Sequence, residues 1–474
     1  MSYFLVGPPT LHWKTENRDK ECRTYLDSML RHFGNLSEGR FYPVENLSLC
    51  YIKSFCQKHS IPTFIINGIA LFHGSLEETL DAIKRAARHH GQPLLIGFNG
   101  ANIVFHENIF LIREVKKIWP KTKTILGQDF SALNYERILT DYPEVDFVCV
   151  GDGELTSKEL YNALAANKSD FSNIPGLAWR SEINVISLNK PEYLNLDELP
   201  WPSRDDVGVA NYHGFGVGVS TSRGCRNRCA FCTTGQLSGK DGIKKPLRLR
   251  NIDDVLNEIE YLYRDYNVRH FVFNDELFFG KDIESKQRAE IFAEKLIKRS
   301  LDLFFMFDMR IDSVDVPLLK LLKTAGLKQV FIGLESASEK QLKRLNKYYP
   351  KELNISETLN KLSELDIKFV PGMINFDPEV TVDDLEINFK MLVNTSLQRW
   401  FLFLSKVRPV PGTFLYNYYL EKGFLEDLWP VPSFKFQNPK IKTFYDELIK
   451  EADKPGITWE DMCKAYLRLL EQAK

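Results

Sequence analysis

The stretch GVGVSTSRGCRNRCAFCTTG, residues 216–235, contains three cysteines in the spacing C-x3-C-x2-C: Cys225, Cys229 and Cys232. Its first part reads as a β-strand, which places the cysteines in the loop that follows the strand. Thiolates are soft ligands that suit iron–sulfur clusters. Three thiolates leave one iron of a [4Fe–4S] cubane without a protein ligand, so that iron can bind the amine and carboxylate of a small molecule.

A zinc site that lacks one ligand is the alternative for these cysteines, because structural zinc takes four ligands. The next histidine along the chain is His270, on an expected strand, and there is no second C-x-x-C pair. Three neighbouring arginines add positive charge, which favours thiolates and offsets the negative charge of a cluster. They are Arg223, Arg226 and Arg228. The pattern therefore favours an iron–sulfur cluster.

Beyond the cysteine loop, apolar runs alternate with helical patterns as far as residue 424. Six expected strands separated by helices predict an open, partial (β/α)6 barrel of the TIM type over residues 206–424, followed by a small helical cap over 425–474. Residues at the strand ends would line the face where barrel chemistry occurs. The expected strands are GVGVSTS (216–222), HFVFNDE (270–276), LFFMFD (303–308), QVFIGLE (329–335), KFVPGMIN (368–375) and WFLFLSKV (400–407).

Residues 1–165 show an earlier β-α rhythm, which predicts a Rossmann-like, doubly wound parallel sheet with helices on both faces. Ser75 is the expected N-cap of one of these helices. Ligands bind to such sheets at the carboxyl ends of the strands, where this chain has FNGAN (98–102) and GDGE (151–154). Residues 166–205 read as a hairpin followed by a Pro-rich linker that contains LDELPWP.

Composition narrows the class of protein. The 474 residues predict two or three domains, and 62 Lys and Arg against 63 Asp and Glu argue against a broad surface for nucleic acid or anionic lipid. No signal peptide is visible and no apolar run reaches the ~18 residues of a spanning helix, so we expect a cytoplasmic protein without membrane contact. The five scattered cysteines are expected to be buried thiols without disulfides. They are Cys22, Cys50, Cys56, Cys149 and Cys463.

The cysteine loop, with Phe231 between its last two cysteines, resembles the signature of the radical S-adenosylmethionine (SAM) superfamily. The resemblance implies that the cluster binds and reductively cleaves SAM to a 5′-deoxyadenosyl radical, with an electron from a donor such as flavodoxin or ferredoxin. The segments HFVFNDELFF, DMRID, FIGLESAS and PGMINFDPEVT resemble the strand ends that contact SAM, although Asn375 stands where the family usually has glycine. The implied SAM contacts are Phe231, Asp275, Glu276, Arg310, Glu335, Ser336 and Asn375.

Other segments resemble the subgroup of this superfamily that has an N-terminal cobalamin-binding domain. They are VGPP at the start, ENLSLCYIKSF, VDFVCVGDGE and LDELPWP. In the barrel, RPVPGTFLY (408–416) resembles the P-x-P-G-T that follows the sixth strand in one subgroup of the superfamily. The D-x-H-x-x-G motif, which gives many such domains a histidine ligand to cobalt, is absent, so we expect a cobalamin site without a histidine lower ligand. The implied cobalamin contacts are Pro9, Asn99, Gly127, Gln128, Gly151, Gly153 and Glu154.

The function that this resemblance implies is a cobalamin-dependent methyltransferase acting on an unactivated carbon of a small-molecule or peptide substrate. Three alternatives stay open: a radical cyclase or mutase with cobalamin that does not methylate, a radical enzyme whose first domain only binds substrate, and a non-catalytic iron–sulfur protein. Methylthiolation is disfavoured because the first domain has no second set of three cysteines. The sequence does not indicate the substrate.

Overall fold

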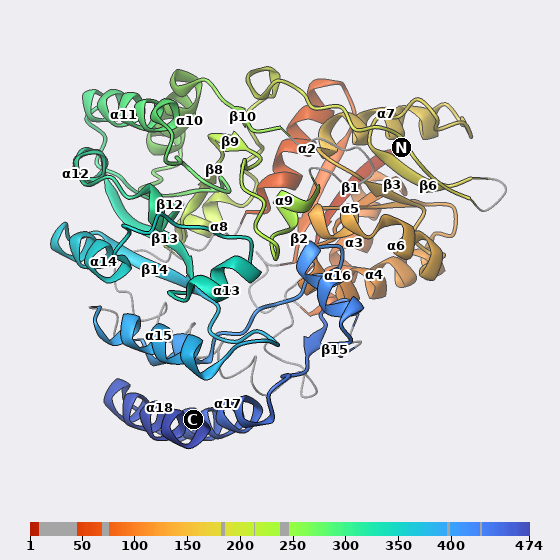
Figure 1. Ribbon diagram of the computed structural model, residues 1–474. Coiled ribbons are helices and arrows are strands. Elements are labelled where there is room, and N and C mark those ends of the chain that lie inside the picture. The colour runs from red at the N-terminus through yellow and green to blue at the C-terminus, as the bar shows by residue number, and fades with distance from the viewer. Residues whose placement is uncertain are drawn as a thin grey trace.

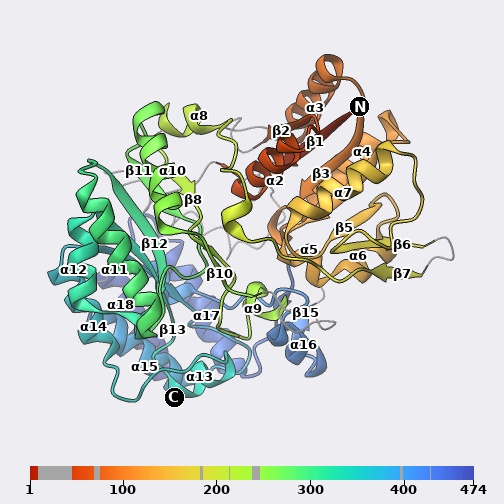
Figure 2. The same ribbon diagram turned by 90° about the horizontal axis from the view of Figure 1, so that it is seen from above.

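The computed structural model describes residues 1–8, 45–68, 75–181, 185–212, 214–237, 246–395, 399–426 and 429–474. Two parallel sheets, each with its own helices, lie side by side (Figure 1). The same arrangement is clear from above, where the segment around α9 (Thr233–Leu237) lies between them (Figure 2). The predicted fold class, a doubly wound sheet followed by a partial barrel and a helical cap, is confirmed.

The first sheet has seven strands in the order β2-β1-β3-β4-β5-β6-β7. The strands β1 to β5 run parallel. The order in which strands are added reverses at β1, because β2 lies on one side of β1 and β3 lies on the other. In open α/β sheets such a switch point opens a crevice at the carboxyl ends of the strands. The parallel strands are β1 (Ser2–Gly7), β2 (Thr63–Asn67), β3 (Pro93–Asn99), β4 (Lys123–Gly127) and β5 (Phe147–Cys149).

The hairpin expected in the linker forms and joins this sheet. Its first strand, β6 (Leu177–Arg180), pairs antiparallel with β5, and its second, β7 (Ile186–Leu188), pairs antiparallel with β6. The sheet therefore continues past residue 165, and we propose that the first domain includes the hairpin. The remaining linker forms η2 (Leu196–Glu198), and its apolar residues pack against α2 (Leu47–Lys58).

Helices cover both faces of the first sheet, because the strands carry apolar side chains on both faces. Phe4 and Val6 pack on the side of α3 (Leu76–His90), whereas Tyr3 and Leu5 pack on the side of α2. Ser75 caps α3 as predicted, in a capping box with Glu78. The other helices of this domain are η1 (Asn102–Val104), α4 (Phe105–Ile118), α5 (Asp129–Leu133), α6 (Tyr135–Asp141) and α7 (Gly153–Ala165).

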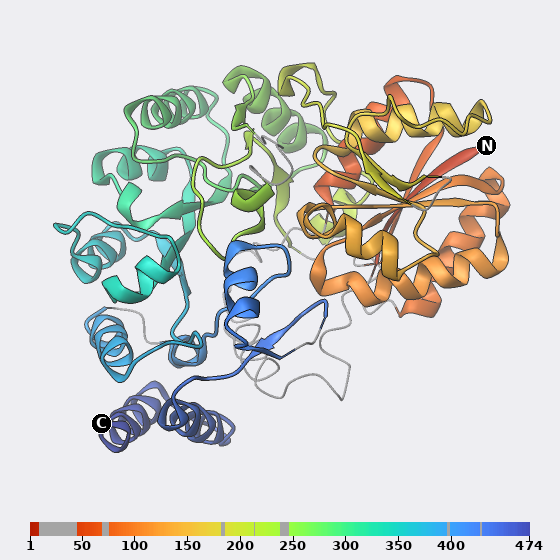
Figure 3. The same cartoon turned by 45° about the vertical axis from the view of Figure 1, so that its right-hand side comes forward.

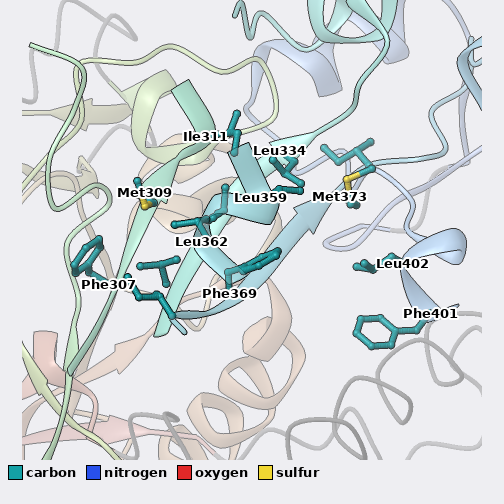
Figure 4. Packing of buried hydrophobic residues seen from close by; sticks show 14 of the residues in the cluster. Phe307, Met309, Ile311, Leu334, Leu359, Leu362, Phe369, Met373, Phe401 and Leu402 are labelled. Atoms are coloured by element: carbon teal, nitrogen blue, oxygen red, sulfur yellow. The ribbon is translucent and has the colours of Figure 1, made fainter. Parts of the chain in front are cut away.

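The second sheet has five parallel strands in the order β14-β13-β12-β11-β8. Its outward residues form one large apolar cluster with the surrounding helices (Figure 4). The strands are β8 (Val217–Val219), β11 (His270–Phe273), β12 (Phe304–Arg310), β13 (Leu327–Glu335) and β14 (Lys368–Met373). The helices between them are α10 (Ile252–Asp265), α11 (Ile283–Lys298), η4 (Ile311–Ser313), α12 (Val316–Thr324), α13 (Glu339–Arg344), α14 (Ile355–Glu364) and α15 (Val382–Val393).

The sixth strand, predicted over 400–407, is wrong in this form. Residues Trp400–Leu404 are a 3-10 helix, η5, and the segment adds only one parallel bridge, between Phe376 and Lys406. The run of apolar residues from 401 to 404 is buried on all sides. A fully apolar run has neither the two-residue period of a half-buried strand nor the 3.6-residue period of an amphipathic helix. The sequence therefore could not distinguish a buried strand from a buried helical turn here.

Short elements and the C-terminal cap complete the chain. The cap packs below the barrel (Figure 3). Among the described residues, no helix is both long and apolar enough to cross a membrane. The remaining elements are α8 (Val207–Tyr212), β9 (Ser222–Arg223), β10 (Arg248–Leu249), α16 (Phe414–Glu421), β15 (Leu425–Glu426), β16 (Ser433–Phe434), α17 (Pro439–Ala452) and α18 (Trp459–Ala473).

Buried ion pairs join the two domains. Arg204, at the end of the linker, is 2.7 Å from Glu45, which precedes α2, and 2.5 Å from Glu258 of α10. Arg250 also contacts Glu258, at 2.6 Å. Arg204 therefore links the segment before α2 to α10 of the barrel.

Candidate functional site between the two sheets

A cavity of about 790 Å³ lies between the two sheets. Its walls come from the carboxyl ends of β3, β4 and β5, from the start of α2, and from the ends of β8, β11 and β12 in the barrel. This volume lies within the range of cofactor and ligand sites. The crevice therefore occupies the switch point of the first sheet and the active face of the barrel together.

Six of the seven residues predicted to contact cobalamin line this cavity: Asn99, Gly127, Gln128, Gly151, Gly153 and Glu154. The seventh, Pro9, lies outside the described residues. Gly151 has a φ of +105°, a conformation that side chains rarely adopt. A Cβ at Gly127 would meet no heavy atom within 4 Å, so the backbone there is open to a ligand.

Gln128 is held in a strained conformation at the edge of the cavity. Its φ of +81° and ψ of 156° fall in a region occupied almost only by glycine. Its side-chain Nε2 donates to Ser48 Oγ at 3.1 Å, which joins the end of β4 to the start of α2. The sequence offered no signal for this strain, since a glutamine after a glycine has many unstrained conformations.

Glu154 is already paired across the domain boundary. Arg223 is 2.8 Å from Glu154 and 3.2 Å from Asp152, and its guanidinium lies 4.6 Å from the ring centre of Tyr51. Arg248 adds a third contact, at 2.7 Å from Asp152. The charge of Arg223, which was expected to act on the cysteine loop, is instead paired with acids of the first domain.

The three cysteines lie together in the loop between β9 and α9, and all three are half-buried. The loop is fixed at Ala230, whose N–H donates to the Leu345 carbonyl at 2.9 Å and whose carbonyl accepts from the Leu415 N–H at 2.9 Å. Cys225 Sγ accepts from the backbone N–H and the side-chain amide of Asn227, both at 3.4 Å. Phe231 packs against the barrel core and helps to anchor the loop.

The positive charges that act on the cysteine thiols come from other residues than the expected arginines of the loop. Arg226 and Arg228 are exposed to solvent. Burial raises the pKa of the Cys229 thiol, and the charges of Lys347 and Arg310 act in the opposite direction. Positive charge therefore reaches the loop from the end of β12, through Arg310, and from the segment after α13, through Lys347.

No group of three or more His, Cys, Asp or Glu residues in the described part of the chain is arranged to hold a single metal ion. The zinc alternative needs four ligands that converge on one ion. A cubane places each thiolate on a different iron, so it does not require that convergence.

Two of the implied SAM contacts, Asp275 and Glu276, line the cavity from the end of β11. Glu276 Oε2 accepts from the Gly224 N–H at 3.0 Å, immediately before the first cysteine. Asp275 is buried and accepts from the backbone and hydroxyl groups of Thr221 and Ser222. Burial raises the pKa of Asp275, although these donors oppose the shift.

Arg310 and Glu335 lie at the ends of β12 and β13, as predicted. Arg310 donates to both carboxylate oxygens of Asp312, at 2.8 and 3.1 Å. Glu335 has a φ of +57° and pairs through Oε1 with the buried Lys347 at 2.6 Å. Its second oxygen, Oε2, is buried without a hydrogen-bond partner among the described residues.

Asn375 and Ser336 are both fully buried. Asn375 Nδ2 donates to the Leu402 carbonyl at 2.7 Å, while its Oδ1 has no hydrogen-bond partner within the described chain. Ser336 Oγ donates to Asn388 at 2.9 Å and accepts from the Ser338 N–H at 2.9 Å, so its hydroxyl is engaged within the barrel.

Sequence reasoning missed several residues of the cavity wall. Asp308, Asn274 and Asp129 line it, and Asp129 accepts from Thr234 at 3.1 Å across the domain boundary. A signal existed for Asp308, because it interrupts the aromatic strand LFFMFDMR on the face opposite Phe307 and Met309.

Comparison with known proteins identifies the barrel. Residues 219–392 match the model of the radical SAM superfamily. These residues form a radical SAM domain. This confirms the resemblance that the cysteine loop indicated.

Two curated relatives and one solved structure are similar to parts of the chain that extend beyond this domain. An uncharacterized methyltransferase of Pyrococcus horikoshii is 24% identical over 80% of this chain and 79% of its own. The anaerobic magnesium-protoporphyrin IX monomethyl ester cyclase of a Synechocystis strain is 28% identical over 56% of this chain. The match spans only about half of that cyclase, 52% of its length. The cobalamin-dependent radical SAM enzyme OxsB, solved with aqua-cobalamin and SAM, shares the fold: its TM-score is 0.71, at 18% identity, over 100% of this chain and 71% of OxsB.

Proposed function

We propose that the protein is a cobalamin-dependent radical SAM methyltransferase that acts on an unactivated carbon of a small-molecule or peptide substrate. One observation carries the proposal: a single cavity is lined by Asn99, Gly127 and Gly151 of the first sheet and by Asp275 and Glu276 of the barrel. Such a cavity can bring a corrinoid and SAM to the same substrate.

The residues of the barrel suit a cluster with SAM. The half-buried thiols of Cys225, Cys229 and Cys232 are the donors that a [4Fe–4S] cluster takes. One carboxylate oxygen of Glu335 and the amide oxygen of Asn375 are buried acceptors that find no donor among the described residues. Leaving such groups unpaired is costly, and the amine and hydroxyl groups of SAM are donors that would satisfy them.

The residues of the first domain suit a corrinoid. Backbone at Gly127 is open to the cavity, and the crevice lies at the carboxyl ends of the strands, where such sheets bind ligands. No histidine is among the described residues that line the cavity. We keep a cobalt site without a histidine ligand from the protein as part of this proposal.

When bound, the cluster with SAM supplies a carbon radical and the corrinoid supplies a methyl group. The chain's own residues bind and orient these groups and exclude water from the cavity. The ion pairs of Arg223 with Asp152 and Glu154 fix the wall between the two halves of the site. Flavodoxin or ferredoxin stays the predicted electron donor.

A radical cyclase or mutase is the second candidate, because one relative is a cyclase at 28% identity. It would use the same barrel residues but transfer no methyl group. The two functions differ in the products of SAM. Methyl transfer yields S-adenosylhomocysteine in addition to 5′-deoxyadenosine, whereas the alternative yields 5′-deoxyadenosine alone.

The test is anaerobic reconstitution with iron, sulfide and hydroxocobalamin, followed by reduction and measurement of both products. We expect about four irons and one corrinoid per chain, and both products. The variant with Cys225, Cys229 and Cys232 all replaced by Ala should lose the cluster and both products, whereas Cys463→Ala should keep them. Cleavage of SAM by the triple variant would refute the radical assignment.

The corrinoid part is tested separately by Gly127→Phe, which adds a bulky ring at the cavity wall where a Cβ meets open space. We expect loss of the corrinoid absorbance and of S-adenosylhomocysteine while the four irons remain. Gly208→Phe, which also meets open space but lies in α8, is the matched control. If Gly127→Phe retains the corrinoid, the proposed cobalamin site is wrong.

A further inference from the structure

Asp308 places a carboxyl group inside the barrel at the wall of the cavity. Its neighbours on β12, Phe307 and Met309, point outward into the apolar cluster, so Asp308 lies on the opposite, inner face of the strand. It is level with Phe331 of β13 and lies two residues beyond the pair formed by Met306 with Val272 of β11. The carboxyl group therefore faces the space between the barrel strands and the first domain.

Asp308 is unlike the other acids of this cavity because nothing in the described chain compensates its charge. Glu154 pairs with Arg223, Asp275 accepts hydrogen bonds from Thr221 and Ser222, and Glu276 accepts from a backbone N–H. The side chain of Asp308 makes no hydrogen bond or ion pair with any described residue. A largely buried carboxylate without a donor is costly, so the site favours a ligand that brings one.

We propose that Asp308 binds an ammonium or guanidinium group of the substrate and thereby determines its specificity for cationic molecules. The inference rests on the proposed function, since it places the substrate beside the groups that react. Substrates that present a carboxylate or phosphate at this point are excluded by repulsion from Asp308 and Asp275.

The charges around Asp308 fix the pH at which this contact forms. Burial, reinforced by the charge of Asp275, raises the pKa of Asp308 to about 7. Arg310, two residues further on β12, is engaged by Asp312, and the facing residues of β13, Gln329, Phe331 and Gly333, carry no charge. Asp308 is therefore mostly protonated at pH 6 and mostly ionised at pH 8.

The test measures binding of n-butylammonium to the protein by calorimetry or ligand-observed NMR, with butyrate and butanol as probes of equal length. An alkylammonium stays protonated between pH 6 and 8, because amines of this type titrate near ~10.4. We expect the Kd of n-butylammonium to be about tenfold lower at pH 8 than at pH 6, as the ionised fraction of Asp308 rises. Butyrate and butanol should show no such preference.

Asp308→Asn keeps the shape of the side chain and removes its charge. It should weaken n-butylammonium binding about ten- to a hundredfold at pH 8 and abolish the pH dependence. Asp302→Asn, an exposed acid just before the same strand, should behave like the unaltered protein. SAM affinity of the reconstituted Asp308→Asn variant should be unchanged.

Equal n-butylammonium binding by Asp308→Asn would overturn the proposal. A loss of SAM affinity in that variant would also overturn it, because Asp308 would then contact SAM rather than the substrate. Since this binding assay needs no turnover, an absence of SAM cleavage in the unaltered protein refutes the proposed function and not the cation site.

Discussion

Asp275 and Asp308 lie near each other in the barrel, yet their surroundings differ. Asp275 accepts hydrogen bonds from Thr221 and Ser222, whereas Asp308 has none from the described residues. Burial raises the pKa of both, and the charge of Asp275 adds to the shift at Asp308. Partners, rather than burial alone, thus decide which acid is free to meet a ligand.

The raised pKa of Asp308 makes the stability of the barrel depend on pH. Its folded pKa of about 7 exceeds the ordinary 3.8, so between these values the folded state binds more protons than the unfolded state. Stability should fall as pH rises from about 4 to about 7, by an amount of order 4 kcal/mol if the shift is fully expressed. Asp308→Asn should be more stable than the unaltered protein at pH 8 and similar at pH 4.5. Guanidinium unfolding at both pH values, with Asp302→Asn as control, measures this.

Glu335 should contribute to SAM binding through its orphan Oε2. Glu335→Gln should weaken SAM binding to the reconstituted protein about ten- to a hundredfold, because a hydrogen bond to a charged group is lost. The iron content should not change. Glu339→Gln, an exposed acid at the start of α13, is the matched control. Calorimetric titration with SAM distinguishes them, and an unaltered affinity in Glu335→Gln would remove this residue from the site.

At the level of elements, local patterns predicted most of the fold because they act within a few residues. Ser75 with Glu78 marks the start of α3, and alternation in β12 sets its two faces. The segment 400–404 could not be assigned in this way, because its apolar run fits a strand and a buried turn equally well. The strain at Gln128 was equally hidden, since it arises from contacts between β4 and α2.

A substitution at Gly151 measures how much the turn after β5 depends on glycine. Gly151→Ala should destabilise the first domain by about 1–2 kcal/mol, because φ is +105° and the new Cβ would lie 3.0 Å from Pro191. Gly208→Ala, in a helix with open space around it, should instead stabilise by about 0.5–1 kcal/mol. Denaturant unfolding of both variants gives the comparison. Equal changes in the free energy of unfolding for the two variants would mean that the turn shifts to accommodate the alanine side chain.

The whole molecule is held together by contacts that the sequence does not reveal. Arg204 pairs with Glu45 and Glu258, which are 159 and 54 residues away along the chain. Motifs located the cysteines and the strand ends because each motif is local. The pairing of Arg223 with Glu154 depends on how two sheets meet, and no single stretch of sequence contains that information.

Arg204→Met should destabilise the protein by about 3–5 kcal/mol, because it leaves the buried carboxyl of Glu45 without its cation and removes one of the two arginines that pair with Glu258. Without this link, the two domains should unfold in two separate transitions in a calorimetric scan. Lys117→Met, which removes an exposed pair with Glu114, should change stability by less than about 1 kcal/mol. Coincident unfolding of the two domains in Arg204→Met would show that other contacts suffice.

The ion pairs of Arg223 with Asp152 and Glu154 limit how this protein can be recombined with its relatives. A chimera that takes its first domain from another protein would lose Asp152 and Glu154 and leave Arg223 of the barrel without these partners. Neither half of the crevice is a transferable module. Exchange of the first domain should succeed only when the arginine before the cysteine loop is exchanged with it.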